Sequence, residues 1–140
     1  MNVGDMMSTD LVTCSPNETL AQVAVKLQQE DIGACPVLDG DKLVGIVTDR
    51  DITVRAVAKS LDVNDTKVGD VMTTNLVSCS QSSSLEDAAR MMADNQIRRL
   101  LIVEDEKLVG IVALADLAID LEEDELLAET IERISEPSRF

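Results

Sequence analysis

The chain contains an internal duplication, which constrains its fold more than any other feature of the sequence. Residues 3–52 align with residues 68–117 at a constant offset of 65, without a gap, and 19 of the 50 aligned positions are identical. The segment Lys42–Val47 recurs letter for letter as Lys107–Val112. Such self-similarity indicates a repeated unit that cannot bury its apolar face alone and packs against its neighbour. We therefore expect two similar units.

Each copy contains one segment with the apolar spacing of a helix that is buried on one face, at positions i, i+3, i+4 and i+7. The apolar positions are Leu20, Val23, Ala24 and Leu27 in the first copy, and Leu85, Ala88, Ala89 and Met92 in the second. Each segment is preceded by a sequence typical of a helix capping box. These sequences are Thr19-x-x-Gln22 and Ser84-x-x-Asp87.

After each predicted helix come two short apolar runs that are separated by a polar turn, which predicts a β-hairpin. The pair Asp39-Gly40 in the first turn strengthens this prediction, because its residues suit a tight hairpin turn. A further helix is expected near Asp51 and near Asp116, and residues 53–67 are expected to connect the copies. The predicted fold class is α/β (α+β), with two tandem β-α-β-β-α repeats that pack with pseudo-twofold symmetry and leave a cleft.

The composition narrows the range of functions. Lys and Arg number 12 and Asp and Glu number 27, so the net charge is −15. This charge argues against nucleic acid and against an acidic membrane surface as partners, because both attract basic proteins. The chain has no His, which removes the commonest general base and any His-ligated zinc site. We expect no catalytic residue, no metal site and no required cofactor.

The cysteines and the N-terminus suggest a cytoplasmic protein. Cys14, Cys35 and Cys79 are odd in number and far apart, which disfavours a disulfide framework and favours small apolar side chains in a reducing compartment. The N-terminus has neither the basic start nor the apolar run of a signal peptide.

The duplicated segments resemble a known family. Two copies of β-α-β-β-α, each ending in Gly-h-Val-x-x-x-Asp (h, hydrophobic), resemble a CBS-domain pair, also called a Bateman module, over about residues 3–120. The resemblance rests most on the stretches from Pro36 to Asp51 and from Ile97 to Val112. It implies an energy or metabolite sensor that binds AMP, ADP, ATP or S-adenosylmethionine. It also implies repeats at 7–65 and 72–120, followed by an acidic helix or tail at 121–140.

The resemblance places the main ligand site in the first copy. The family's ribose and phosphate motif, Gly-h-x-(Thr/Ser)-x-x-Asp, is matched by Gly45, Thr48 and Asp51. A carboxylate can accept both ribose hydroxyls, and a hydroxyl with free amides suits a phosphate. The alternative is that Thr48 only caps the helix, with Asp51 at its third position. Pro36 and Ile46 complete the ligand-binding residues that the resemblance implies in this copy.

The second copy departs from the motif and brings in basic residues. It retains Asp116, but Ala113 replaces the threonine and Ala115 replaces Arg50, which puts this site in doubt. By position in the family, Arg98 and Arg99 would reach the phosphates of the Thr48/Asp51 site, and Arg50 would serve the Asp116 site. An exposed arginine pair can instead serve solubility or form ion pairs.

The tail from Asp120 to Glu136 carries eight acidic residues and one arginine. Leu121, Leu126, Leu127, Ile131 and Ile134 suggest a partly amphipathic helix in it, which packs on the module, on a second copy or on a separate target.

We expect a stand-alone regulatory module that binds an adenosine-containing ligand and forms a homodimer, with a possible unidentified protein target. The alternative is a ligand-free structural or interaction domain. An enzyme is the least favoured interpretation, because no base, nucleophile and oxyanion set is visible.

Overall fold

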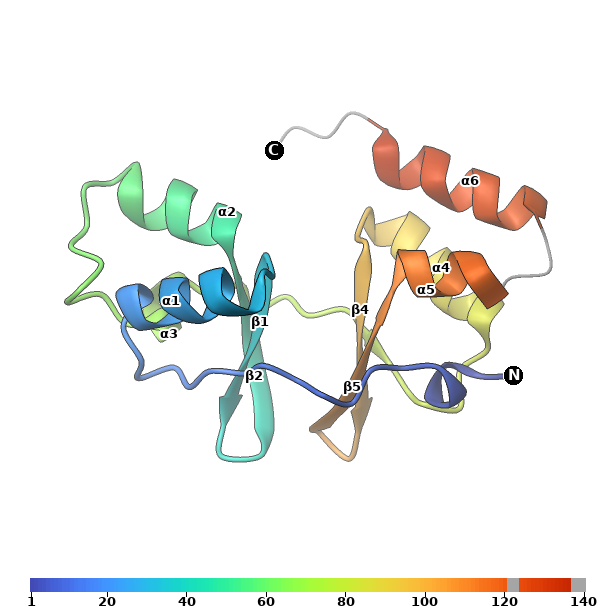
Figure 1. The fold of residues 1–140 in the computed structure, drawn as a ribbon, viewed down its shortest axis with the longest axis horizontal. Coiled ribbons are helices and arrows are strands. Elements are labelled where there is room, and N and C mark those ends of the chain that lie inside the picture. Colours follow the sequence, from blue (N-terminus) through green and yellow to red (C-terminus); the bar gives the residue numbers. More distant parts are fainter. Residues whose placement is uncertain (121–123, 137–140) are drawn as a thin grey trace. The chain divides into compact units, whose positions relative to one another are not determined.

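The computed structural model describes residues 1–120 and 124–136 and confirms the predicted mixed α/β fold (Figure 1). The chain divides into two compact units. One comprises Val12–Leu76, and the other combines Met1–Leu11 with Val77–Phe140. They are called here the first-repeat unit and the second-repeat unit. Within the described ranges, none of the helices has both the length and the apolar character needed to cross a membrane.

The first-repeat unit is built on one β-hairpin. Its elements are α1 (Leu20–Glu30), β1 (Ala34–Asp39), β2 (Lys42–Thr48), α2 (Asp49–Ile52), the π-helical turn η2 (Thr53–Val57) and α3 (Val68–Val71). β1 and β2 pair antiparallel, and Gly40 adopts φ 64° in the turn between them, a conformation that glycine takes without strain. Figure 1 shows α1 and α2 on the same side of this hairpin. The predicted hairpin is therefore confirmed.

One expectation for this unit is wrong in detail. The strand expected to open the repeat reduces to a parallel bridge between Cys14 and Val37, because only the backbone of Cys14 pairs with β1 there. The helix expected near Asp51 is present and continues through Val57, into the segment expected to connect the copies. Ala58 N donates to Thr53 O at 2.9 Å, which extends the helix that starts at Asp49.

The second-repeat unit is built on three strands. Its elements are η1 (Val3–Asp5), β3 (Ser78–Cys79), α4 (Leu85–Asn95), β4 (Arg99–Glu104), β5 (Lys107–Ala113), α5 (Leu114–Asp120) and α6 (Asp124–Ser135). β4 pairs antiparallel with β5 and parallel with β3. The N-terminal segment joins this unit through Ser8, which exchanges two backbone hydrogen bonds with Ile111 at 2.8 and 3.0 Å.

The caps of the two long helices differ. Thr19 and Gln22 form the predicted reciprocal capping box at the start of α1. At α4, the Ser84 hydroxyl accepts from Asp87 N at 3.1 Å, but the box is not completed. The Asp87 carboxylate instead lies 3.5 Å from Arg90. The second capping box predicted from the sequence is therefore wrong, although the cap itself is present.

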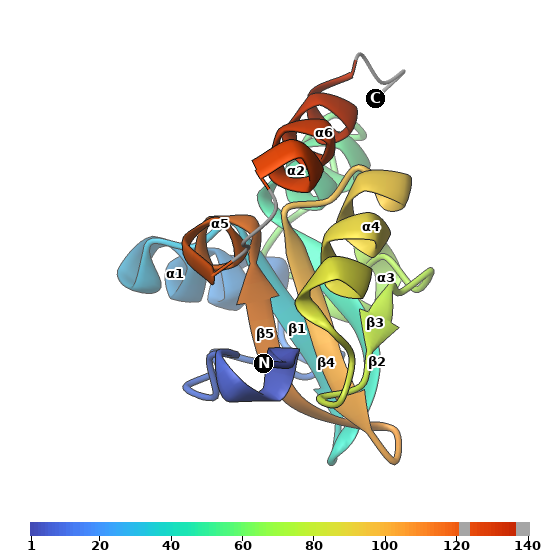
Figure 2. The same cartoon turned by 90° about the vertical axis from the view of Figure 1, so that its right-hand side faces the viewer.

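The buried faces of these helices also differ, because α6 packs on α4. The predicted buried positions of α4, from Leu85 to Met92, are all buried. Ala24 on α1 was expected to be buried but is exposed, whereas its counterpart Ala89 on α4 is fully buried. Figure 2 shows α6 beside α4, and α1 has no such helix in its own unit. Leu126 and Leu127 of the predicted tail helix are half-buried against the unit's core, and Leu121 lies outside the described residues.

Candidate functional site

The first-repeat motif lies where residues 72–73 return onto β2. Ile46 and Thr73 exchange two backbone hydrogen bonds, at 2.9 and 2.8 Å. Gly45 permits this close approach, because a Cβ atom there would lie 2.6 Å from the Met72 Sδ and 3.0 Å from the Thr73 carbonyl oxygen. The glycine of the motif is thus explained by backbone packing within the unit.

Asp51 is the centre of a hydrogen-bonded network at the start of α2. Its Oδ2 accepts from Thr48 N at 3.1 Å, and the Thr48 hydroxyl accepts from Asp51 N at 3.0 Å. The Thr73 hydroxyl donates toward both carboxylate oxygens at 3.2 Å, and Arg55 Nε lies 3.7 Å from Oδ1. Only 10% of the Asp51 side chain is exposed. Both carboxylate oxygens therefore already have partners within the unit.

The other candidates of the first copy lie around this network. Arg55 donates to the carbonyl oxygens of Val71 and Met72 at 3.1 and 3.2 Å, so it ties α2 and η2 to the returning segment. Arg50 is exposed, and Pro36 is buried in β1. The structure thus brings Thr48 and Asp51 together with Arg55.

Asp116, the counterpart of Asp51, has different surroundings. It is exposed, and among the residues that the structure describes its carboxylate accepts one hydrogen bond, from Ala113 N at 3.3 Å. The loss of the threonine at position 113 removes the capping hydroxyl, as the sequence indicates. The carboxylate of the second copy is therefore the one that has acceptor positions left for a ligand.

A cavity of about 490 Å³ lies within the second-repeat unit, beside the start of α5. It is lined by Arg98, Arg99, Ala113, Leu114, Ala115, Ala118, Ile131, Ile134 and Ser135. Its volume is in the range of small-molecule sites, and it combines an apolar wall with two cations, as such sites do. Neither arginine forms an ion pair with a described residue. The cavity can therefore accept a ligand that has an apolar body and an anionic group.

Two sets of residues in these sites were missed by the sequence analysis. The hydroxyl of Thr73 was available as a signal, since the aligned position in the other copy is Ser8, also a hydroxyl residue. The cavity-lining role of Ile131, Ile134 and Ser135 had no sequence signal, because it depends on where α6 packs.

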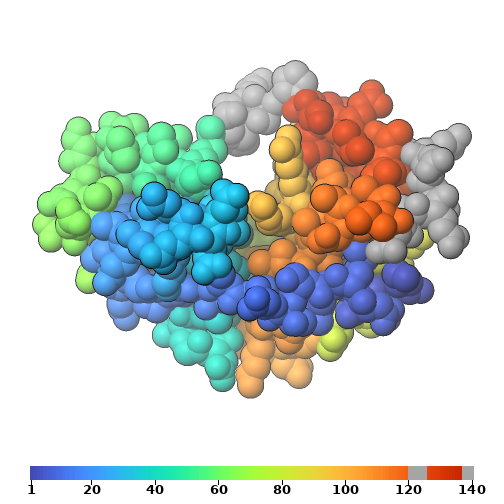
Figure 3. All heavy atoms as spheres, viewed as in Figure 1, coloured from blue at the N-terminus to red at the C-terminus, as the bar shows by residue number. Residues whose placement is uncertain are grey.

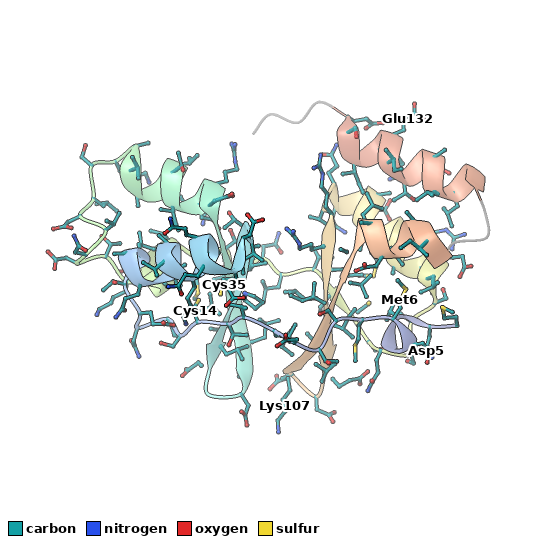
Figure 4. The ribbon with its side chains drawn as sticks, viewed as in Figure 1. Asp5, Met6, Cys14, Cys35, Lys107 and Glu132 are labelled. Atoms are coloured by element: carbon teal, nitrogen blue, oxygen red, sulfur yellow. The ribbon has the colours of Figure 1, made fainter. Side chains whose placement is uncertain are left out.

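The cysteines occupy apolar positions, as the sequence predicts. Cys14 and Cys35 are buried in the core of the first-repeat unit, and Figure 4 shows them together beside α1. Their mutual hydrogen bond, together with burial, raises the pKa of the Cys14 thiol, and the same hydrogen bond lowers the pKa of Cys35. Within residues 1–120 and 124–136, no group of three or more Cys, Asp or Glu side chains is arranged to hold a metal ion.

Comparison with known proteins identifies the family. The CBS domain model matches residues 3–57 and 68–123. The CBS domain-containing protein YhcV of Bacillus subtilis is 45% identical over 134 residues, which cover 96% of this chain and 95% of YhcV.

Solved structures of similar proteins support the same family. Hypoxic Response Protein I, solved with two coordinated zinc ions, has a TM-score of 0.78 at 32% identity and covers 86% of this chain and 99% of its own. The CBS domain pair of protein MJ0100, in complex with 5′-methylthioadenosine and S-adenosyl-L-methionine, has a TM-score of 0.73 at 28% identity and covers 85% of this chain and 94% of its own. The chain therefore belongs to the CBS-domain family and carries two copies of that domain.

Proposed function

We propose that this protein is a regulatory module that binds an adenosine-containing ligand, with the anionic group of the ligand on Arg98 and Arg99. The observation that carries the proposal is the arginine-lined cavity in a chain whose net charge is −15. Two cations that form no ion pair with any described residue of so acidic a protein favour an anionic ligand. The MJ0100 domain pair, which holds 5′-methylthioadenosine and S-adenosyl-L-methionine, supports the adenosine class.

In this proposal the three parts of the ligand have separate partners. The apolar wall packs on the base and the arginines bind the phosphate. The Asp116 carboxylate, which does not line the cavity itself but is hydrogen-bonded to the cavity residue Ala113, is the proposed acceptor for the ribose hydroxyls. The first-repeat motif is a second proposed position, with Thr48, Arg50, Ile46 and Pro36 around Asp51. A ligand there has to share Asp51 with Thr73 and Arg55, whose hydrogen bonds and charge already engage both carboxylate oxygens.

The proposed mechanism is a shift between conformations. A ligand that binds one conformation more tightly increases the population of that conformation, and the change is read by a partner or by a second copy of the chain. We propose no catalytic activity, because the chain has no histidine to act as a general base. We also propose a cytoplasmic homodimer, with adenine nucleotide as a regulatory ligand and not a required cofactor.

The test is calorimetric titration of the full chain with AMP, ADP, ATP, S-adenosylmethionine and 5′-methylthioadenosine. We expect phosphate-bearing ligands to bind more tightly than the uncharged 5′-methylthioadenosine. Arg98→Ala with Arg99→Ala should weaken AMP binding by about 30-fold or more, because charge-assisted hydrogen bonds are lost. Lys42→Ala with Lys59→Ala changes the net charge equally at exposed sites outside the cavity and should bind AMP like the wild type.

Absorbance offers an independent measurement. The chain has no Trp, no Tyr and one Phe, so bound adenine dominates its ultraviolet spectrum near 260 nm. Protein incubated with AMP should therefore show a 260 nm band in equilibrium dialysis that the double arginine variant loses. If none of the five ligands binds in either experiment, the regulatory proposal is wrong and the protein is a structural or interaction domain.

A further inference from the structure

The C-terminal helix α6 is an addition to the two CBS domains. It begins at Asp124, immediately after the second match to the family model, which ends at residue 123. It packs on α4, and three of its apolar side chains are half-buried against the core of the second-repeat unit. These side chains are Leu126, Leu127 and Ile134. The helix therefore has a defined place in this unit.

The polar contacts that attach α6 to α4 are weak. Its ion pair, Arg133 with Asp94, joins side chains that are 39% and 60% exposed, and such exposed pairs stabilise little. Gln96 Nε2 adds hydrogen bonds to the carbonyl oxygens of Arg133 and Glu136, at 3.2 and 3.4 Å and also at the surface. A second cavity of about 90 Å³ lies between the two helices, so their packing is incomplete. A modest additional contact can therefore change how firmly α6 is docked.

The same helix forms one wall of the arginine-lined cavity. Ile131, Ile134 and Ser135 face the space that Arg98 and Arg99 line from the start of β4. Figure 3 shows the atoms of α6, in red, directly beside those of α5, in orange. Ile131 is 46% exposed, so a large apolar side chain is available to a ligand in the cavity. A ligand there touches both the β4–α5 wall and the α6 wall.

From these contacts we infer that α6 is a ligand-dependent flap, whose docking on α4 is strengthened when a nucleoside monophosphate occupies the cavity. This inference rests on the proposed function. The arginines hold the phosphate, and Ile131 and Ile134 cover the apolar base, so the ligand joins α6 to the rest of its unit. Because these contacts with α6 exist only in the docked state, the ligand binds that state more tightly and increases its population.

The experiment is hydrogen–deuterium exchange of the full chain with and without AMP, at an AMP concentration that calorimetry shows to be saturating. We expect amide exchange across residues 124–135 to slow by about threefold or more, since ligand binding to the docked state adds to its stability. Exchange in α1, which lies in the other unit, is the internal reference.

Point variants separate contact with the ligand from the folding of the helix. Ile131→Ala should weaken AMP binding by about three- to tenfold, because apolar contact with the ligand is lost. The thermal midpoint should change little, because Ile131 is already half exposed. Glu132→Ala is the matched control, since Glu132 is exposed and lies on the side of α6 away from α5 (Figure 4). It should bind AMP at least as well as the wild type.

The outcomes are distinct. AMP binding with unchanged or faster exchange in 124–135 overturns the flap and leaves the proposed function intact. AMP binding that Ile131→Ala does not weaken also overturns it. If AMP does not bind at all, the inference is wrong; if the other four ligands fail as well, the proposed function fails with it.

Discussion

Asp51 and Asp116 occupy the same position in the two copies but have different environments. Asp51 is bonded by the Thr48 amide and the Thr73 hydroxyl and lies beside Arg55, and it is almost fully buried. Asp116 is exposed and accepts one hydrogen bond from the residues that the structure describes. The same side chain thus supports the fold in one copy and remains open to solvent in the other.

We therefore predict that two equivalent substitutions change the free energy of unfolding by very different amounts. Asp51→Ala should lower the free energy of unfolding by about 2–3 kcal/mol, because a buried network loses its acceptor. Asp116→Ala should change it by less than about 0.5 kcal/mol, as exposed substitutions usually do. Urea denaturation followed by circular dichroism measures both. Equal losses for the two variants would contradict this assignment.

At the scale of elements, one strand of each unit is covered by a segment that is adjacent in sequence to the other repeat. Residues 72–73 cover Gly45 on β2, and the N-terminal segment covers Gly110 on β5, where Met7 lies against the glycine. The glycines recur in both copies because each strand needs one position without a side chain. The glycine of the repeated Gly-Ile-Val sequence thus lets the covering segment approach the strand in both units.

Replacing Gly45 should push residues 72–73 away from β2. Gly45→Ala places a Cβ atom 3.0 Å from the backbone oxygen of Thr73, which cannot move without disturbing the hydrogen bonds to Ile46. We expect a loss of about 1–3 kcal/mol, as for other overpacked sites.

Gly33→Ala is the control for this substitution. The nearest atom to its new Cβ belongs to the exposed side chain of Asp49, at 3.2 Å, which can turn away. The free energy of unfolding of the Gly33→Ala protein should stay within about 0.5 kcal/mol of that of the wild type. Chemical denaturation of the two variants side by side tests the difference, and a Gly45→Ala protein as stable as Gly33→Ala would count against the tight approach.

At the scale of the whole molecule, the duplication places exposed apolar side chains at equivalent positions. Ile119 on α5 is 82% exposed, and its counterpart Val54 in η2 is 46% exposed. Val57, one helical turn beyond Val54, is 59% exposed. Large apolar side chains that remain exposed in both repeats favour burial against a second copy.

We predict a homodimer that buries Val54 and Ile119. Light scattering at tens of micromolar should report a particle of two 15.2 kDa chains. Val54→Glu with Ile119→Glu should yield the monomer, because burying two new charges at an interface is costly. Leu61→Glu, at a side chain that is 43% exposed elsewhere, should remain a dimer. A wild-type particle of 15.2 kDa would disprove the prediction.

The sequence by itself determined most of the local structure of this protein. The 50-residue duplication, the helix stripe of Leu85 to Met92, the Thr19 capping box and the Asp39-Gly40 turn all predicted local structure that the fold contains. Each of these patterns depends on residues a few positions apart, whose conformations and contacts are set mainly by the neighbouring backbone. The CBS resemblance rested on the same local motifs.

Only the tertiary structure decided which segments far apart in the sequence meet. It brought Thr73 onto Asp51 and so gave both oxygens of the carboxylate that the motif indicates for a ligand a partner within the unit. It also packed α6 on α4, which buries Ala89 where Ala24 is exposed and brings Ile131 to the cavity beside Arg98. Periodicity and spacing describe one element at a time. Which carboxylate is satisfied and which arginine lines a cavity depends on packing between elements, so it was not visible in the sequence.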